Sequence, residues 1–223
     1  MGRSTVFDLI GPVMVGPSSS HTAGAVRLGA MARKICGGEI LEAVLTLHGS
    51  FAETGKGHGT NRALVAGLLG FNTDDEQIPH SLEIAEKRGI KIVFATEDLG
   101  EVHPNTVKMH LKNKEGKEVE VVGSSLGGGR ILIHRINEFP VEIMGDYHTL
   151  VVLQKDLPGV VAQVTSLIAA TQINIAQMRV SREKKGAYAL MIIETDQALD
   201  QAALAVIKKI PTVKDAMIIE PLE

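Results

Sequence analysis

The stretch Leu150-Val-Val-Leu-Gln-Lys-Asp-Leu-Pro-Gly159 opens the most regularly patterned half of the chain. Its aliphatic residues predict a strand, and Asp-Leu-Pro-Gly predicts a turn into a helix. The elements expected next are a helix over 159–170, strands over 173–181 and 187–195, a helix over 200–209 and a strand over 216–220. This βαββαβ order is the ferredoxin-like, split βαβ arrangement.

Aliphatic residues at every second position should line the inner face of this predicted sheet. The positions expected to face the two helices include Leu150, Val152, Ile173, Ile175, Leu190 and Ile192. Burial contributes ~1.5–3 kcal/mol for each such side chain. About a dozen of them together would exceed the entropy cost of ordering a small domain only narrowly. We therefore expect self-association through sheet edges or helices.

A polar, turn-prone segment at Gly145-Asp146 predicts a boundary between a first domain (1–145) and a second domain (148–223). The first domain has mixed signals without a steady βα alternation, which predicts an α+β fold. Its expected elements are helices over 22–35, 61–70 (capped by Thr60) and near 81–88, strands over 41–47, 90–95 and 131–136, and a hairpin turning at Lys114-Glu-Gly116. The Gly127-Gly-Gly129 run is predicted to form a bend, with an anion-binding nest as the alternative.

Three short polar loops of the first domain carry the candidate chemistry. They are Gly16-Pro-Ser-Ser-Ser-His-Thr-Ala-Gly24, His48-Gly-Ser-Phe-Ala-Glu-Thr-Gly-Lys-Gly-His-Gly-Thr60 and His103-Pro-Asn105. They contain four of the eight histidines of the chain. Glycines let the backbone approach a ligand closely. Hydroxyl, imidazole and free backbone N–H groups together suit a small anionic, polar ligand better than an apolar partner.

Composition narrows the class of protein. The 223 residues are 44% apolar and 22% charged, as in an ordinary globular protein. A net charge of −3, no tryptophan and only two Tyr and five Phe disfavour nucleic acid and acidic membranes as partners. No run approaches the ~18 apolar residues that span a bilayer, and the first residues lack the apolar core of a signal peptide. We expect a cytoplasmic protein.

The single cysteine, Cys36, excludes an intramolecular disulfide. This chain alone also lacks the three or four thiolates that usually hold an iron–sulfur cluster. Because Cys36 follows an apolar helical stretch, we expect it to be a small buried hydrophobic residue. A zinc site is disfavoured, since His48 and His58 lack ligand spacing on a helix and have no cysteine beside them.

The segment Phe7-Asp-Leu-Ile-Gly-Pro-Val-Met-Val-Gly-Pro-Ser-Ser-Ser-His-Thr-Ala-Gly24 and the loops at His48 and His103 resemble the β subunit of bacterial iron–sulfur-dependent L-serine dehydratase (L-serine ammonia-lyase). The half opened by Asp156-Leu-Pro-Gly159 is similar to ACT domains, which bind amino acids in many metabolic enzymes. The resemblance covers the whole chain. It implies a first domain related to the allosteric substrate-binding fold, followed by an ACT domain.

The resemblance also implies a division of labour. A separate α subunit would supply the cysteines for a [4Fe–4S] cluster, and no metal ligand would come from this chain. The implied reaction converts L-serine to pyruvate and ammonia. An unsaturated iron would polarise the serine hydroxyl while a base takes the Cα proton.

Site residues follow from the same resemblance. We expect His48 and His103 to be catalytic, as proton carriers or orienting donors in a site shared with the α subunit. Ser50 and Asn105 would hold the substrate carboxylate or hydroxyl. The residues expected to bind substrate are Ser18, Ser19, Ser20, His21, Thr22, His58 and Thr60. The alternative for Ser18–Ser20 is a helix cap, and for His21 and His58 the support of loop geometry.

For the ACT-like half, the expected ligand residues are Asp156, Pro158, Gly159 and Asn174. The alternative is a structural Pro-Gly turn in a domain that only joins subunits. Two other functions stay open: a regulatory serine-binding subunit with all catalytic groups elsewhere, and a free-standing amino-acid sensor.

Overall fold

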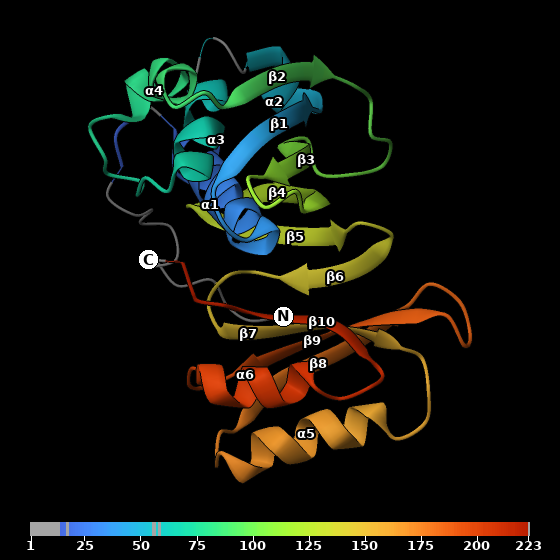
Figure 1. Cartoon of the computed structure of the whole chain (residues 1–223). Helices are drawn as coiled ribbons and strands as arrows, with labels where there is room; N and C mark the ends of the chain where they lie inside the picture. The colour runs from blue at the N-terminus through green and yellow to red at the C-terminus, as the bar shows by residue number, and fades with distance from the viewer. Residues whose placement is uncertain (1–13, 17, 55–56, 58, 223) are drawn as a thin grey trace. The chain divides into compact units, whose positions relative to one another are not determined.

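The computed structural model describes residues 14–222, apart from residues 17, 55, 56 and 58. The chain divides into two compact units. The first unit extends to Asn137 and regains Glu142–Met144, and the second comprises Glu138–Val141 and Gly145–Pro221. Each unit contains one β-sheet with helices packed on it (Figure 1).

The first unit is built on a six-stranded sheet. The strands of this sheet are β1 (Ile40–Leu47), β2 (Lys91–Thr96), β3 (Thr106–Asn113), β4 (Glu118–Gly127), β5 (Arg130–Ile136) and β6 (Phe139–Ile143), in the order β2-β1-β3-β4-β5-β6. Of β6, only Glu142 and Ile143 fall within the first unit. β2 runs parallel to β1, whereas β3, β4 and β5 each run antiparallel to the strand before them in this order. The mixed sheet confirms the predicted α+β class.

Helices cover this sheet. They are the π-helix η2 (Ser19–Ala23), α1 (Gly24–Cys36), α2 (Gly49–Thr54), α3 (Thr60–Leu69), the 3-10 helix η3 (Ile78–His80) and α4 (Ser81–Lys87). α1 packs against β3, β4 and β5, and α3 packs along α1. Their close approach depends on Gly67, where a Cβ atom would lie 2.0 Å from the carbonyl oxygen of Val26. α1 therefore lies between the sheet and α3.

Two local predictions for this unit differ from the structure. Thr60 does not cap α3 but is its first residue, and Gly59 is the N-cap with a positive φ of 74°. A positive φ strains residues with a Cβ atom, so glycine takes this position. The loop predicted after His48 contains α2 instead, a short helix without a strong sequence signal.

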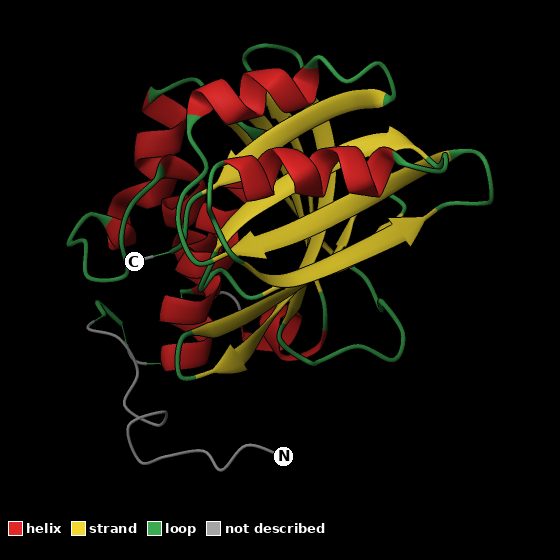
Figure 2. Ribbon diagram, turned by 90° about the horizontal axis from the view of Figure 1, so that it is seen from below, coloured by secondary structure: helices red, strands yellow, loops and turns green. Residues whose placement is uncertain are grey.

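The second unit has the predicted ferredoxin-like order. Its elements are β7 (His148–Lys155), α5 (Val160–Ala170), β8 (Ile175–Arg182), β9 (Tyr188–Thr195), α6 (Gln201–Lys208) and β10 (Val213–Ile219). The strands lie in the order β10-β7-β9-β8, and every pair is antiparallel. Figure 2 shows α5 and α6 side by side over one face of this sheet.

The core of the second unit confirms two of the three predicted pairs of residues that face the helices. Leu150 and Val152 are buried against the helices, and Ile173 and Ile175 pack at the edge of the same cluster. The third pair was wrong. Met191 and Ile193 face the helices, so Leu190 and Ile192 lie on the opposite face of β9. Every residue of β9 after Tyr188 is buried, and a strand buried on both faces carries no alternation from which its phase can be deduced.

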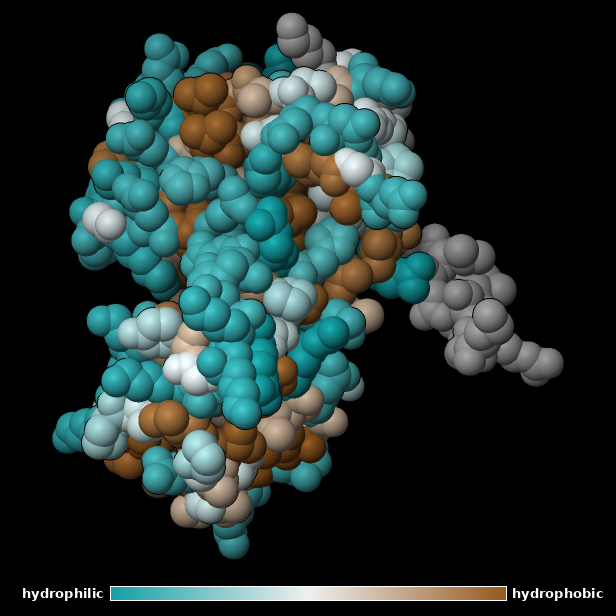
Figure 3. All heavy atoms as spheres, turned by 90° about the vertical axis from the view of Figure 1, so that its right-hand side faces the viewer, coloured by the Kyte–Doolittle hydropathy of each residue, from teal (hydrophilic) through white to brown (hydrophobic). Residues whose placement is uncertain are grey.

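The face drawn in Figure 3 is largely hydrophilic, with apolar residues in small groups among polar ones. None of the helices in the described part of the chain is long and apolar enough to cross a bilayer.

Candidate active site in the first unit

The loop after β1 and the loop before β3 are in direct contact. The backbone N–H of His48 donates to the carbonyl of Thr106 (3.1 Å), which continues the pairing of β1 with β3. Gly49 has a φ of 51°, and a Cβ atom there would lie 2.7 Å from the carbonyl oxygen of Pro104. The sheet thus brings together the His48 and His103 motifs, which are 55 residues apart in the sequence.

Backbone hydrogen bonds define the tautomer of both imidazoles. The N–H of Leu99 donates to Nδ1 of His48, and the N–H of Asn105 donates to Nδ1 of His103, each at 3.1 Å. A ring nitrogen that accepts a hydrogen bond carries no proton, so each neutral imidazole bears its proton on Nε2. His48 is half-buried and His103 is exposed. Both side chains therefore present an N–H donor rather than a free basic nitrogen.

His21 links the first loop to the second. Its Nε2 lies 3.1 Å from Oγ of Ser50, and its Nδ1 lies 3.3 Å from Oγ of Ser18. Ser18 is also the N-cap of η2, since its Oγ accepts from the backbone N–H of His21 (3.2 Å). The His21 ring packs edge-on against Phe51, with centroids 5.4 Å apart. The structure therefore brings the three predicted loops into one region.

Buried polar atoms without partners surround this region. Among the described residues, such atoms include Oγ1 of Thr22, Oγ1 of Thr60, Oδ1 of Asn61 and Oγ of Ser125. These residues belong to η2, α3 and β4, and η2 packs against both of the others. An unpaired buried polar group costs ~1–3 kcal/mol, and a polar ligand that supplies the missing partner removes that penalty.

A chain of hydrogen bonds links the His103 loop to strands β3, β4 and β5. His134 Nε2 lies 2.8 Å from Oγ of Ser124, which lies 2.5 Å from Oγ1 of Thr106. Thr106 Oγ1 in turn donates to the carbonyl of His103 (2.5 Å). Because the hydroxyl of Thr106 donates to a carbonyl, it accepts from the hydroxyl of Ser124. Ser124 in turn accepts from Nε2–H of His134. Burial lowers the pKa of His134, and the nearby His103 lowers it further, which favours this neutral form.

Several residues of this region escaped the sequence analysis. Asn61, Ser124, Ser125 and His134 belong to no polar motif, and only the pairing of β3, β4 and β5 shows where the last three lie. The other predicted residues are placed as follows. Asn105 is half-buried and its carbonyl accepts from the N–H of Ser125 (3.0 Å). Ser19 and Ser20 are half-buried in η2, and His58 lies outside the described residues.

In the second unit, Asn174 lies apart from the other predicted ligand residues, Asp156, Pro158 and Gly159. Asp156 accepts from the N–H of Gly186 (3.2 Å), and Gly159, with a φ of 88°, is the N-cap of α5 after Pro158. Asn174 donates to Asp196 (2.9 Å) instead. These two hydrogen bonds lie at opposite ends of β9, because Lys155 pairs with Tyr188 whereas His148 pairs with Thr195.

Cys36 is fully buried, as predicted, and burial raises the pKa of its thiol. A raised pKa disfavours the thiolate that binds metals. Within the described residues, no group of three or more His, Cys, Asp or Glu side chains is placed to hold a metal ion. The described part of this chain therefore does not fit an iron–sulfur cluster.

Comparison with known protein families identifies the part of the chain that contains the three loops. The family described as "Serine dehydratase beta chain" matches residues 5–135, which include all three loops, and the ACT domain family matches residues 148–212. The chain belongs to the serine dehydratase β-chain family. Its loops therefore lie in the part of the chain that defines the family.

Two relatives of similar length support this membership. The chain is 46% identical to the probable L-serine dehydratase, beta chain, of Bacillus subtilis, over 96% of both chains. It is 40% identical to the L-serine dehydratase, beta chain, of Peptoniphilus asaccharolyticus, over 89% of this chain and 90% of that one. It is also 29% identical to the D-3-phosphoglycerate dehydrogenase of Synechocystis, over 86% of this chain but 35% of the relative.

Proposed function

We propose that this chain is the β subunit of an L-serine dehydratase that converts L-serine to pyruvate and ammonia together with a separate α subunit. The contact of the three family loops carries this proposal: His21 bridges Ser18 and Ser50, and Gly49 lies against Pro104. Donor groups from distant segments thus surround one region, which suits a small substrate with a carboxylate and a hydroxyl.

His48 and His103 act as orienting donors in this proposal. Each Nε2–H can hold an oxygen of the substrate, while Nδ1 stays bonded to the backbone. Ser50, whose Oγ lies 3.1 Å from Nε2 of His21, and Asn105, whose N–H donates to the His103 ring, would bind the carboxylate or hydroxyl. The unpaired hydroxyls of Thr22, Thr60 and Ser125 provide further partners. A histidine serving as base would first have to lose its backbone hydrogen bond.

The [4Fe–4S] cluster of such an enzyme would belong to the α subunit. The single cysteine of this chain is buried in the core and cannot bind it. The reacting centre would then form between the two subunits, with this chain positioning the substrate.

Self-association through the second unit is part of the proposal. β8 is an edge strand of its sheet, and Met178 and Val180 on it are exposed. An exposed apolar edge strand favours pairing with another chain. A ligand site using both the Asp156 turn and Asn174 would need two copies, because the two lie at opposite ends of β9 within one chain.

A regulatory role for the first-unit site is the second candidate. Two neutral imidazoles that donate hydrogen bonds would also suit a serine-binding site that only activates the enzyme.

Reconstitution decides between the two functions. The full chain is combined anaerobically with a cysteine-bearing α subunit, and pyruvate formation is measured for wild type, His48→Gln and His103→Gln. A fall in kcat supports the catalytic function. Normal kcat with loss of activation by serine supports the regulatory one. If pyruvate forms at the same rate with and without this chain, both functions are contradicted.

A further inference from the structure

A second polar region lies at the other end of β1. Here a cavity of about 260 Å³ opens between the C-terminal ends of α1 and α3, the starts of β1 and β2, and the turn between β3 and β4. The residues that line it are Arg33, Glu39, Ile40, Leu68, Leu69, Arg88, Ile90 and Lys114. β1 spans eight residues, so at ~3.3 Å per residue this cavity lies roughly 23 Å from the His48 loop.

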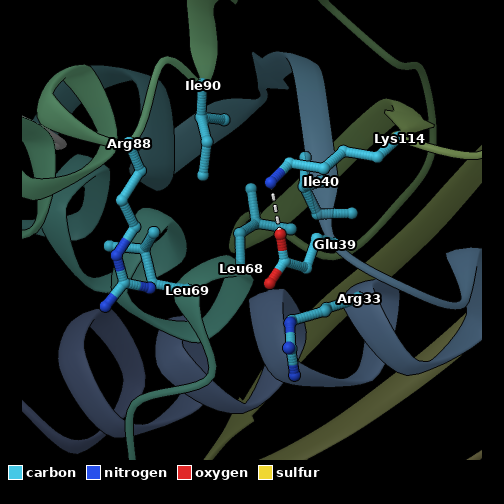
Figure 4. A pocket seen from close by; sticks show the side chains of 8 residues that line it. All are labelled: Arg33, Glu39, Ile40, Leu68, Leu69, Arg88, Ile90 and Lys114. Atoms are coloured by element: carbon cyan, nitrogen blue, oxygen red, sulfur yellow. Dashed lines mark hydrogen bonds and ion pairs between the residues drawn. The ribbon is translucent and has the colours of Figure 1, made fainter.

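Positive charge dominates the lining. Arg33, Arg88 and Lys114 face a single carboxylate, that of Glu39, so the cavity carries a net charge of +2. Figure 4 shows Lys114 bonded to Glu39, with the two guanidinium groups apart from this pair. The hydrogen bond and charge of Lys114, and then the charges of Arg33 and Arg88, lower the pKa of Glu39. One carboxylate therefore balances only part of the charge.

The arginines lack carboxylate partners within hydrogen-bonding distance in the described part of the chain. Arg33 lies beside Gly70, 3.1 Å from where a Cβ atom would be, and Arg88 lies over the Phe71 ring at 5.9 Å. A guanidinium group presents several N–H donors in a planar fork that matches carboxylate and phosphate oxygens. These donors are thus available to an anion.

The floor of the cavity is apolar. Ile40, Leu68 and Leu69 are buried beneath the charged groups, and Ile90 is partly buried. Charged groups above an aliphatic floor suit a ligand that has both an anionic group and a short carbon chain. The volume suits a small metabolite rather than a nucleotide or peptide.

Helix stabilisation explains only part of this arrangement. Arg33 is in the last turn of α1, where a cation interacts favourably with the partial negative charge of a helix C-terminus. Arg88 is the C-cap of α4, so it also lies at a helix C-terminus, and Lys114, from the β3–β4 turn, is paired with Glu39. Helix ends explain each arginine separately, but not why guanidinium groups from two different helices line the same cavity.

We propose that this cavity binds a small organic anion, one with a carboxylate or phosphate group and a short aliphatic part. Its anionic group lies between Arg33 and Arg88, and Glu39 competes with it for Lys114. This site is separate from the proposed serine site, so each is tested without the other.

The test measures binding of inorganic phosphate and of butyrate to the full chain by calorimetry and by NMR shifts of residues around the cavity. We expect binding of one or both anions in the millimolar range or tighter. Arg33→Gln and Arg88→Gln should weaken it roughly ten- to hundredfold each, because each removes charged hydrogen bonds. Glu39→Gln should strengthen it, a gain that damage to the fold cannot produce.

Controls separate this site from general charge effects. Lys185→Gln removes one exposed positive charge from the second unit and should leave binding unchanged. His48→Gln should also leave it unchanged. Absence of binding for both anions, or equal affinity in wild type and in the Arg33→Gln, Arg88→Gln double variant, would overturn the proposal.

Discussion

The two ends of β1 differ in how their polar groups are assembled. At the His48 end, hydroxyls and neutral imidazoles come from three short sequence motifs. Hydrogen bonds to the backbone and to each other hold these groups in place. At the Ile40 end, three cations from separate elements surround an apolar hollow. The first end can orient a ligand through precise donors, whereas the second attracts one by charge. Their separation means that a change at one end should leave the other intact.

The strongest test of this contrast is His48→Ala combined with His103→Ala in the reconstituted enzyme. Removal of one positioned hydrogen-bond donor typically costs about 10²–10³-fold in kcat, so the double variant should lose at least about 10²-fold in turnover. Anion binding at the Arg33 cavity should not change. Steady-state kinetics and calorimetry on the same protein measure both, and normal turnover would remove the assigned roles.

A change between the two ends should damage both. Gly67→Ala places a methyl group against the carbonyl of Val26 and forces α1 and α3 apart. Overpacking of this kind costs about 1–3 kcal/mol, which exceeds the gain in helix propensity of about 1 kcal/mol. Denaturant unfolding should therefore show a net loss of stability, with weaker anion binding. A more stable variant would mean that the helices are not in tight contact.

Thr60→Val should separate stability from function at the His48 end. The buried Oγ1 of Thr60 has no partner in the described structure, so its removal should raise the free energy of unfolding by about 1 kcal/mol. Binding of L-serine should weaken at the same time. The control is Thr106→Val, which removes a buried hydroxyl that has two partners and should lower stability. Equal effects in the two variants would contradict the assignment.

The smallest expected effect concerns pH. Burial lowers the pKa of His134 in the folded chain, so between that pKa and about 6.5 the unfolded chain binds more protons. The free energy of unfolding should therefore fall as pH decreases below about 6.5. His134→Gln should flatten this dependence, because it removes the buried imidazole. Urea unfolding across this pH range measures the slope.

The regular half of the chain was largely predictable. The βαββαβ order follows from strand and helix periods and from turn residues, which act over a few neighbours. In the first unit, the hairpin turn at Gly116 and the end of α3 at Gly70 were predictable for the same reason. The phase of β9 was not, because a strand buried on both faces has the same composition on each.

The candidate site was predictable only as three motifs. Their residue types indicated hydrogen bonding to a small polar ligand, and the resemblance to a family indicated which one. The tautomers of His48 and His103 depend on the N–H groups of Leu99 and Asn105, whose direction is a property of the folded loops. His134 joins the site only through strand pairing.

The sequence by itself determined the local elements, the family loops and the absence of enough cysteines for a cluster. Tertiary structure alone decided which distant segments meet: His21 contacts Ser50, the backbone of Gly49 lies against Pro104, and Arg33 and Arg88 line the same cavity. The physical reason is range. Turns, caps and periodicity depend on neighbours within a few residues, whereas sites form where sheet register and helix packing bring distant segments together.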